Sequence, residues 1–294
     1  MNAGQGPLSW TGLLARSFRL YRERFDEYFP LVIGASVLAY TVYFTLAYLN
    51  HSVFEEPARI VFFGRRFVPL LLWELEVVVA WLAGAFAFAC VSAKVLNTGD
   101  KRMSLAQAME SVKPSVGRIV RAGLYGALST IVFYVLVMPV LLRPLPFILF
   151  AIPGPYINIR LAFSIVRGSI LLLFSTLLAK MALAIPELVD NKGRTSLREA
   201  VGNSLRHTAG HELFLALWLG AAATISAGVY TVSQYFIRDF CLRGTIDQQA
   251  CSWLQALSMV VILALVATPT FICFSLFHSE AKRWNRVSAT GTPG

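Results

Sequence analysis

The stretch LLWELEVVVAWLAGAFAFACVSAK, from Leu71 to Lys94, is apolar over almost its whole length. An α-helix crosses the roughly 30 Å hydrocarbon core of a bilayer with about 20 mostly apolar residues, so this stretch is long enough to span. Comparable runs recur along the chain. The six predicted spans are Leu31–Leu49, Leu71–Lys94, Ile119–Leu141, Leu161–Pro186, Leu213–Phe236 and Trp253–Phe277. The sequence therefore predicts an all-α, polytopic transmembrane helical bundle.

The composition supports a membrane protein. Hydrophobic residues make up 56% of the chain and charged residues only 14%, against about 25% charged residues in a typical soluble domain. No polar stretch is long enough to form a separate core. We therefore expect a single transmembrane domain over residues 1–286, followed by a disordered tail rich in Ser, Gly, Thr and Pro at 287–294.

The positive charges predict the orientation of the bundle. The net charge is +10, and most of the 26 Lys and Arg residues fall in the two termini and in the loops that follow the second and fourth spans. Basic residues favour the cytoplasmic side, so both termini should be cytoplasmic. We expect this face to attract anionic lipid headgroups. Nucleic acid is not an expected partner, because the sequence contains no basic and aromatic binding module.

A three-fold repeat is predicted, with units at about residues 9–100, 104–192 and 196–284. Each unit begins with Ser followed by a large apolar residue, continues as a short amphipathic helix and then supplies two spans. Ser104 with Gln107 and Ser196 with Glu199 match the pattern of a helix capping box. Helices of this kind should lie flat at the headgroup level. The alternative is that each is an ordinary cytoplasmic extension of the next span.

The segment Leu145–Pro155, between the third and fourth spans, is apolar but is flanked by prolines. Proline lacks a backbone donor, and too few residues separate the breaks to cross a bilayer. A re-entrant or interfacial segment is therefore predicted. Six spans fit the charge pattern better than seven, although the sequence leaves the count open between residues 143 and 186.

Several short motifs resemble those of a bacterial membrane-protein family. They are Leu14-Ala-Arg-Ser17-Phe-Arg-Leu-Tyr21, Pro153-Gly-Pro-Tyr156, Pro186-Glu187 and Ala200-Val-Gly-Asn-Ser204-Leu. The chain resembles the YciC-type inner-membrane proteins and the membrane domain found fused to some glycerophosphodiester phosphodiesterases. This resemblance implies six helices in a bacterial plasma (inner) membrane. The sequence holds no soluble phosphodiesterase domain, so that activity is not implied.

Ionisable residues at membrane depth are the default candidates for function, because burying them in lipid is costly. Arg160 and Arg167 are seven residues apart and should share a helix face, where they and Glu74 are candidates for binding a lipid headgroup. The alternative is that both arginines extend to the interface. Lys94 and Lys180, near the cytoplasmic ends of their spans, are predicted to do the same.

Glu187 follows Pro186 and is predicted to form a structural ion pair with Arg19 or Arg206, which would hold an interfacial helix in place. Cys241 and Cys251 share the last external loop, and their spacing permits a disulfide without requiring one.

His207 and His211 are one helical turn apart, but the intervening residues do not match the zinc protease motif. No metal site is predicted there.

No nucleophile, phosphate-binding loop or cofactor motif is recognisable. We therefore expect a non-enzymatic, multi-pass integral membrane protein without a cofactor, in an organising, regulatory or lipid-engaging role. Membrane lipids are the expected partners, together with a membrane protein partner. The main alternative is a transporter or lipid translocator that uses the Pro/Gly-broken segment between spans three and four. A lipid-modifying enzyme is a third hypothesis, which lacks an identifiable catalytic group.

Overall fold

The computed structural model describes residues 10–54, 64–97, 102–143, 159–192, 194–242 and 247–290. Over these residues the chain is all-α and contains no strand. The helices are α1 (Trp10–Glu23), α2 (Phe25–Phe54), α3 (Gly64–Leu96), α4 (Leu105–Val112), α5 (Val116–Val132), α6 (Met138–Leu142), α8 (Ile159–Ala182), α9 (Ala184–Asp190), α10 (Leu197–Thr208), α11 (Glu212–Leu242) and α12 (Gln248–Thr290). A 3₁₀ turn (Lys113–Ser115) links α4 to α5, and a π-helical turn (Phe133–Val137) links α5 to α6.

Six helical segments of the described chain are long and apolar enough to cross a membrane. They are Phe25–Leu46, Trp73–Leu96, Leu105–Leu142, Ile165–Asp190, Glu212–Cys241 and Trp253–Arg283. Each overlaps one of the six runs predicted from the sequence, so the prediction of an all-α transmembrane bundle is confirmed. The segment Leu145–Pro155 lies outside the described residues.

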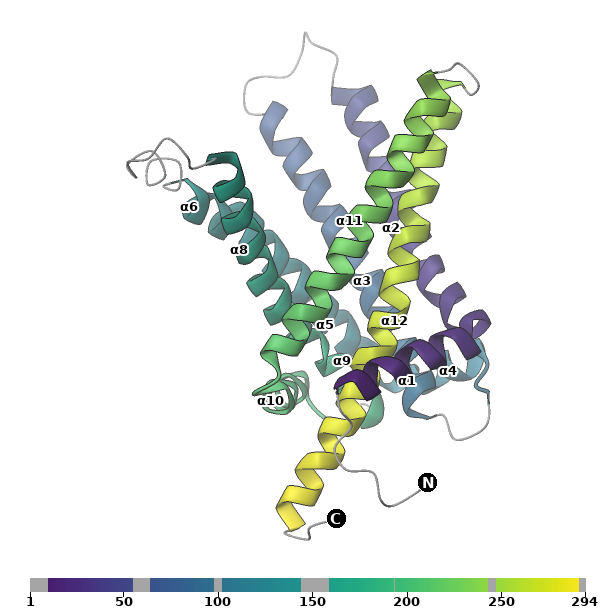
Figure 1. The fold of residues 1–294 in the computed structure, drawn as a ribbon, viewed down its shortest axis with the longest axis vertical. Helices are drawn as coiled ribbons and strands as arrows, with labels where there is room; N and C mark the ends of the chain where they lie inside the picture. The colour runs from purple at the N-terminus through teal and green to yellow at the C-terminus, as the bar shows by residue number, and fades with distance from the viewer. Residues whose placement is uncertain are drawn as a thin grey trace.

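The short amphipathic helices α1, α4 and α10 gather at one end of the bundle (Figure 1). The backbone amide of Gln107 donates to the Ser104 hydroxyl, and the Gln107 side chain accepts from the Ser104 amide, as a capping box requires. Ser196 and Glu199 form the second box, and these hydrogen bonds lower the pKa of the Glu199 carboxyl. Both predicted boxes are confirmed, while the repeat relationship between the three units stays a prediction.

Local backbone features mark the junctions between α4 and α5 and between α10 and α11. Pro114 lies in the 3₁₀ turn between α4 and α5, where its missing amide disrupts the regular hydrogen-bond ladder. Gly210 lies between α10 and α11 with φ of +82°, a left-handed conformation that glycine adopts without a steric cost. These two positions allow the chain to change direction between a short helix and the long helix that follows it.

Helices α3 and α12 form the centre of the bundle. In the most apolar window of α12, 67% of residues are buried, against 6% for α2 and for α11. The rings of Phe88 and Phe271 stack with centroids 4.8 Å apart, and the hydroxyls of Ser92 and Ser275 are 2.9 Å apart. The peripheral helices expose large apolar side chains such as Leu173 (72%), as expected for surfaces that face lipid.

Cys241 of α11 and Cys251 of α12 form a disulfide, with Cα atoms 6.2 Å apart. The bridge that the sequence permitted is therefore present. It joins the last two long helices at the end of the bundle opposite the short helices, where α11 and α12 meet (Figure 1).

Two sequence predictions need correction. The tail was expected to be disordered from residue 287, but α12 continues to Thr290, and no glycine or proline occurs between Pro269 and Gly291. Residues 291–294 lie outside the described part. Lys94 is not exposed at the end of its span as predicted: it is 3% exposed, with Nζ 3.8 Å from a carboxylate oxygen of Glu27. The Nζ atom of Lys180 is 2.6 Å from a carboxylate oxygen of Glu212.

Candidate functional site

A pocket of about 550 Å³ opens between α3, α5, α8, α9 and α10, at the end of the bundle where the short helices gather. This volume is within the range of small-molecule sites, roughly 300–1,000 Å³. The pocket is mostly apolar, and its charged lining residues are Arg121 of α5 and Arg198 of α10. Its position beside the amphipathic helix α10 places it next to the predicted membrane interface.

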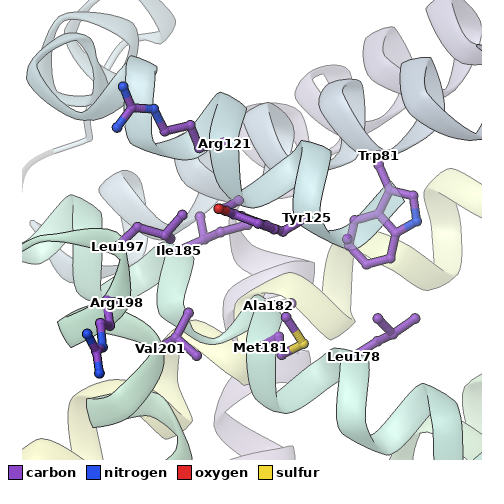
Figure 2. Close-up of a pocket in the computed structure, with 12 residues that line it drawn as sticks. Trp81, Arg121, Tyr125, Leu178, Met181, Ala182, Ile185, Leu197, Arg198 and Val201 are labelled. Atoms are coloured by element: carbon purple, nitrogen blue, oxygen red, sulfur yellow. The ribbon is translucent and has the colours of Figure 1, made fainter. Parts of the chain in front are cut away.

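The polar end of the pocket consists of these two arginines and the hydroxyl of Tyr125. Figure 2 shows both guanidinium groups at one end, with Tyr125 directed toward them and Trp81 at the opposite end. Neither arginine forms an ion pair or hydrogen bond with another described residue. Arg194 and Arg206 line an adjacent polar groove that shares Arg198. The groove also contains Glu199, so the mouth of the pocket carries a net positive charge within the described chain.

The apolar end of the pocket is held in a fixed shape by Trp81. Its indole Nε1 donates a hydrogen bond to the Thr130 hydroxyl at 2.9 Å. The indole ring lies directly against the backbone of Gly126, where an added Cβ would be 2.5 Å from Trp81 Cε3. Leu178 and Met181 of α8 complete this end. Only glycine at position 126 permits this close approach of α3 and α5.

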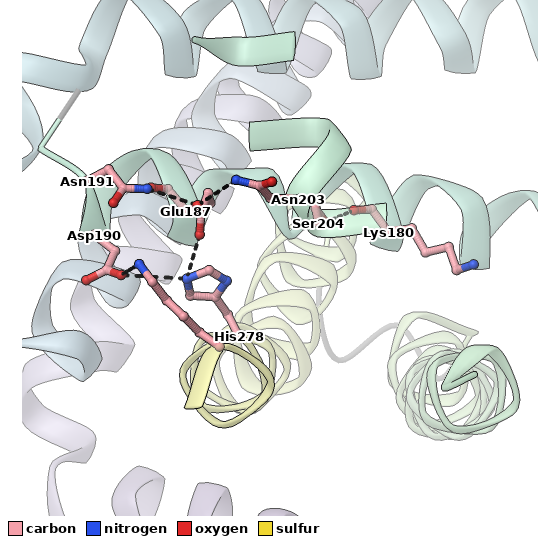
Figure 3. Close-up of polar contacts among 8 residues, drawn as sticks. Lys180, Glu187, Asp190, Asn191, Asn203, Ser204 and His278 are labelled. Carbon is pink, nitrogen blue, oxygen red and sulfur yellow. Dashed lines mark hydrogen bonds and ion pairs between the residues drawn. The ribbon is translucent and has the colours of Figure 1, made fainter. Parts of the chain in front are cut away.

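A buried polar cluster anchors the helices that carry the pocket. Glu187 of α9 is 4% exposed, and its Oε1 accepts hydrogen bonds from the side-chain amides of Asn191, at 2.9 Å, and Asn203, at 3.1 Å. Its Oε2 lies 3.2 Å from Nε2 of His278 on α12. Figure 3 shows these groups converging on Glu187 from three helices. A buried carboxylate needs such partners, since leaving it unpaired is costly.

Further contacts extend this cluster. Lys282 forms an ion pair with Asp190, and Asp190 lies 4.0 Å from His278. The Ser204 hydroxyl of α10 donates to the carbonyl of Lys180, at the C-terminal part of α8. Through Asn203 and Ser204, helix α10 is therefore fixed to α8 and α9. Because Arg198 lies on α10, this cluster also positions one arginine of the pocket.

Glu187 was predicted to hold an interfacial helix through an ion pair with Arg19 or Arg206. The contact with an interfacial helix is present, but the predicted partners are wrong. Glu187 does contact an interfacial helix, but through Asn203 of α10. Within the described chain it forms no ion pair with Arg19 or Arg206, which are both exposed. The reason is that α9 is buried between α10 and α12, where Asn203 and His278 face it and the exposed arginines cannot.

The proposed headgroup site at Glu74, Arg160 and Arg167 stays a prediction. Glu74 and Arg167 form no ion pair with each other, and Arg167 is exposed on α8. The side chain of Arg160 lies outside the described part.

Neither Arg121 nor Arg198 is among the residues that were predicted from the sequence to bind a ligand. The spacing of Arg121 and Tyr125, one helical turn apart, was the available signal that both belong to one face.

The two histidines near α10 contribute to packing. His211 packs edge-on against Trp10, with ring centroids 4.7 Å apart, and against Phe277. His207 lies 6.1 Å from the ring of His278, and its burial, with the nearby His278, lowers its pKa. Among the described residues, no three His, Cys, Asp or Glu side chains gather closely enough to hold a metal ion.

Comparison with known proteins gives no match to a family model, to a curated protein or to a solved structure.

Proposed function

We propose that this chain is a non-enzymatic integral membrane protein that binds an anionic lipid in the pocket between Arg121 and Arg198. The observation that carries the proposal is the division of this pocket into a cationic mouth and an apolar interior. Guanidinium groups bind phosphate through paired, charge-assisted hydrogen bonds. The walls formed by Trp81, Leu178 and Met181 suit an acyl chain. A phospholipid with a net negative charge matches both ends.

The setting of this pocket is part of the same proposal. The protein would lie in a bacterial inner membrane with both termini cytoplasmic, as the distribution of basic residues favours. The resemblance to YciC-type proteins is consistent with this location. Lipid binding at the cytoplasmic face would serve an organising or regulatory role, with a membrane protein as a further partner. Anchoring of α10 by Glu187 would keep the headgroup site in place.

Native mass spectrometry of the full chain in lipid nanodiscs tests the proposal. With phosphatidylglycerol and phosphatidylcholine present together, wild type should retain phosphatidylglycerol at fixed stoichiometry. The double variant Arg121→Gln/Arg198→Gln should retain it at least tenfold less. Arg19→Gln/Arg22→Gln removes the same charge from exposed positions on α1 and should bind as wild type does.

Two results would overturn this proposal. Equal losses in both double variants would mean that retention depends only on net charge. If Arg167→Gln loses phosphatidylglycerol while Arg121→Gln/Arg198→Gln retains it, the headgroup site lies at the residues first predicted from the sequence.

Lipid translocation is a second candidate, favoured by a row of cavities along α3. A cavity of about 380 Å³ between α3, α8 and α12 shares Trp81 and Leu178 with the arginine pocket. It shares Ala80 and Gly84 with a further cavity beside α2. Transfer of a fluorescent phospholipid between the leaflets of reconstituted vesicles tests this role. Gly84→Leu should slow the transfer, and absence of transfer by wild type would remove the candidate.

A further inference from the structure

A second cavity, of about 440 Å³, lies between α2, α3, α11 and α12. Its residues on α3 begin at Glu76, in the half of the span that is farther from α4 and Lys94. Small side chains create the space, among them Ala39 of α2 and Ala80 of α3. Gly84 also lines it, and a Cβ added there would meet no atom within 4 Å. The helices therefore leave this volume unfilled by side chains.

One carboxylate is directed to this cavity. Glu76 is the charged member of the described lining, and it forms no hydrogen bond or ion pair with another described residue. An anion at membrane depth is unfavourable unless a positive charge lies beside it. No Lys, Arg or His lines the cavity within the described chain. A bound cation would supply the missing positive charge.

Three tyrosines surround the same space. Tyr40 and Tyr43 come from α2 and Tyr230 comes from α11. The rings of Tyr40 and Tyr43 have centroids 5.4 Å apart and are inclined by 52°, so they form a corner. Tyr43 and Tyr230 are 39% and 37% exposed, which leaves ring surface open to a ligand. Aromatic faces attract cations, and quaternary ammonium groups are bound by clusters of such rings.

The remaining walls are apolar. Met259 and Leu263 of α12 and Val32 of α2 are among the apolar residues that line the cavity. A small hydrated metal ion fits this lining poorly, because it requires several oxygen ligands and the described residues here provide one carboxylate. A phosphate or sulfate headgroup would be repelled by Glu76. A ligand with an organic cation at one end and a hydrocarbon chain at the other fits both parts.

We infer that this cavity binds a long-chain amphiphile with an ammonium headgroup. The ammonium lies between the Glu76 carboxylate and the faces of Tyr40 and Tyr43, and the alkyl chain lies against α2 and α12. This site is separate from the proposed anionic-lipid pocket, whose charged residues are Arg121 and Arg198. The two sites select opposite headgroup charges, which makes them separable by experiment.

The test uses the full chain in a neutral maltoside detergent with submicellar dodecyltrimethylammonium, and native mass spectrometry to count the retained adduct. Wild type should retain one adduct per chain, and Glu76→Gln should bind at least tenfold more weakly. Glu74→Gln, which removes a carboxylate two residues away on the same helix, should bind as wild type does. Dodecyl sulfate, with the same chain, should not displace the ammonium compound, and tetramethylammonium should bind weakly because it lacks the chain.

Variants at Tyr40 separate ring recognition from simple filling of space. Tyr40→Phe keeps the aromatic face and should keep the affinity within about twofold, whereas Tyr40→Leu should lose at least fivefold. Arg121→Gln/Arg198→Gln should leave ammonium binding unchanged, so failure of the anionic-lipid proposal would not affect this result. Undiminished binding by Glu76→Gln, or equal retention of the sulfate at this site, would overturn the inference.

Discussion

The Nε2 atom of His278 lies 3.2 Å from the Oε2 atom of Glu187, and their side chains are only 2% and 5% exposed. The separation is short enough for an ion pair, but the two groups lack the alignment of a hydrogen bond, and neither atom has a hydrogen-bond partner among the described residues. The other carboxylate oxygen of Glu187 accepts from Asn191 and Asn203. Glu187 therefore connects α9, α10 and α12 through one buried group.

Replacing Glu187 with Ala should destabilise the protein strongly. The change leaves the two amide side chains and the imidazole without their shared partner, and removal of one member of a buried ionic cluster costs about 3–5 kcal/mol. Thermal unfolding of the purified protein in detergent micelles measures the effect. Glu187→Gln should cost less, because its amide oxygen can still accept from Asn203.

The matched control for this prediction is Glu280→Gln on α12. Glu280 forms an exposed ion pair with Arg16, at 3.3 Å, and pairs of this kind contribute about 0–1 kcal/mol. If Glu187→Ala is within about 1 kcal/mol of wild type in its free energy of unfolding, Glu187 does not anchor α10 to the bundle.

Acidification should destabilise the fold partly through His207. Burial is the main cause that lowers the pKa of His207. The nearby His278 and Lys282 lower it further, while Glu187 opposes them. A histidine whose pKa is lowered on folding binds more protons when unfolded, so its contribution to stability is lost as pH falls below the unfolded value of about 6.5. In His207→Gln, stability should decline less steeply between pH 7 and 5. Parallel pH profiles for the two proteins would contradict this prediction.

The fold was predictable because hydropathy and helix caps are properties of short stretches of sequence. Six apolar runs of sufficient length can only be helices in a membrane of this kind. The capping boxes at Ser104 and Ser196 each involve two residues that are only three positions apart in the sequence. By contrast, the burial of Lys94 beside Glu27 depends on how α2 packs against α3, which the sequence does not state.

The candidate site was less predictable for the same reason. The partners of Glu187 include His278, which is distant in sequence, and the meeting of α9 with α12 determines their contact. Similarly, Arg121 and Arg198 share a pocket only because α5 and α10 pack against α8 and α9. Charged residues within the spans were the predicted candidates, whereas Arg121 and Arg198 lie where the spans meet an interfacial helix.

Gly126→Ala should be destabilising, because its methyl group would lie 2.5 Å from the Trp81 ring. Displacing that ring strains the contact between α3 and α5 and disturbs the hydrogen bond to Thr130, at a cost of about 1–3 kcal/mol. Gly84→Ala is the control, since its added methyl group meets nothing within 4 Å. It should raise stability by up to about 1 kcal/mol through its higher helix propensity. Equal thermal stabilities for the two variants would contradict the proposed packing role of Gly126.

The disulfide between Cys241 and Cys251 provides a test of the proposed orientation. If both termini are cytoplasmic, this bridge lies on the opposite side of the membrane. An impermeant reductant followed by an impermeant maleimide should then label two thiols in intact cells. Cys90 and Cys273 are completely buried, so Cys241→Ser/Cys251→Ser should remain unlabelled. Thr195→Cys in that double variant places a thiol beside α10 and should react only after the membrane is permeabilised. Labelling of the Thr195→Cys variant in intact cells, together with protection of Cys241 and Cys251 in the wild-type protein, would establish the reverse orientation.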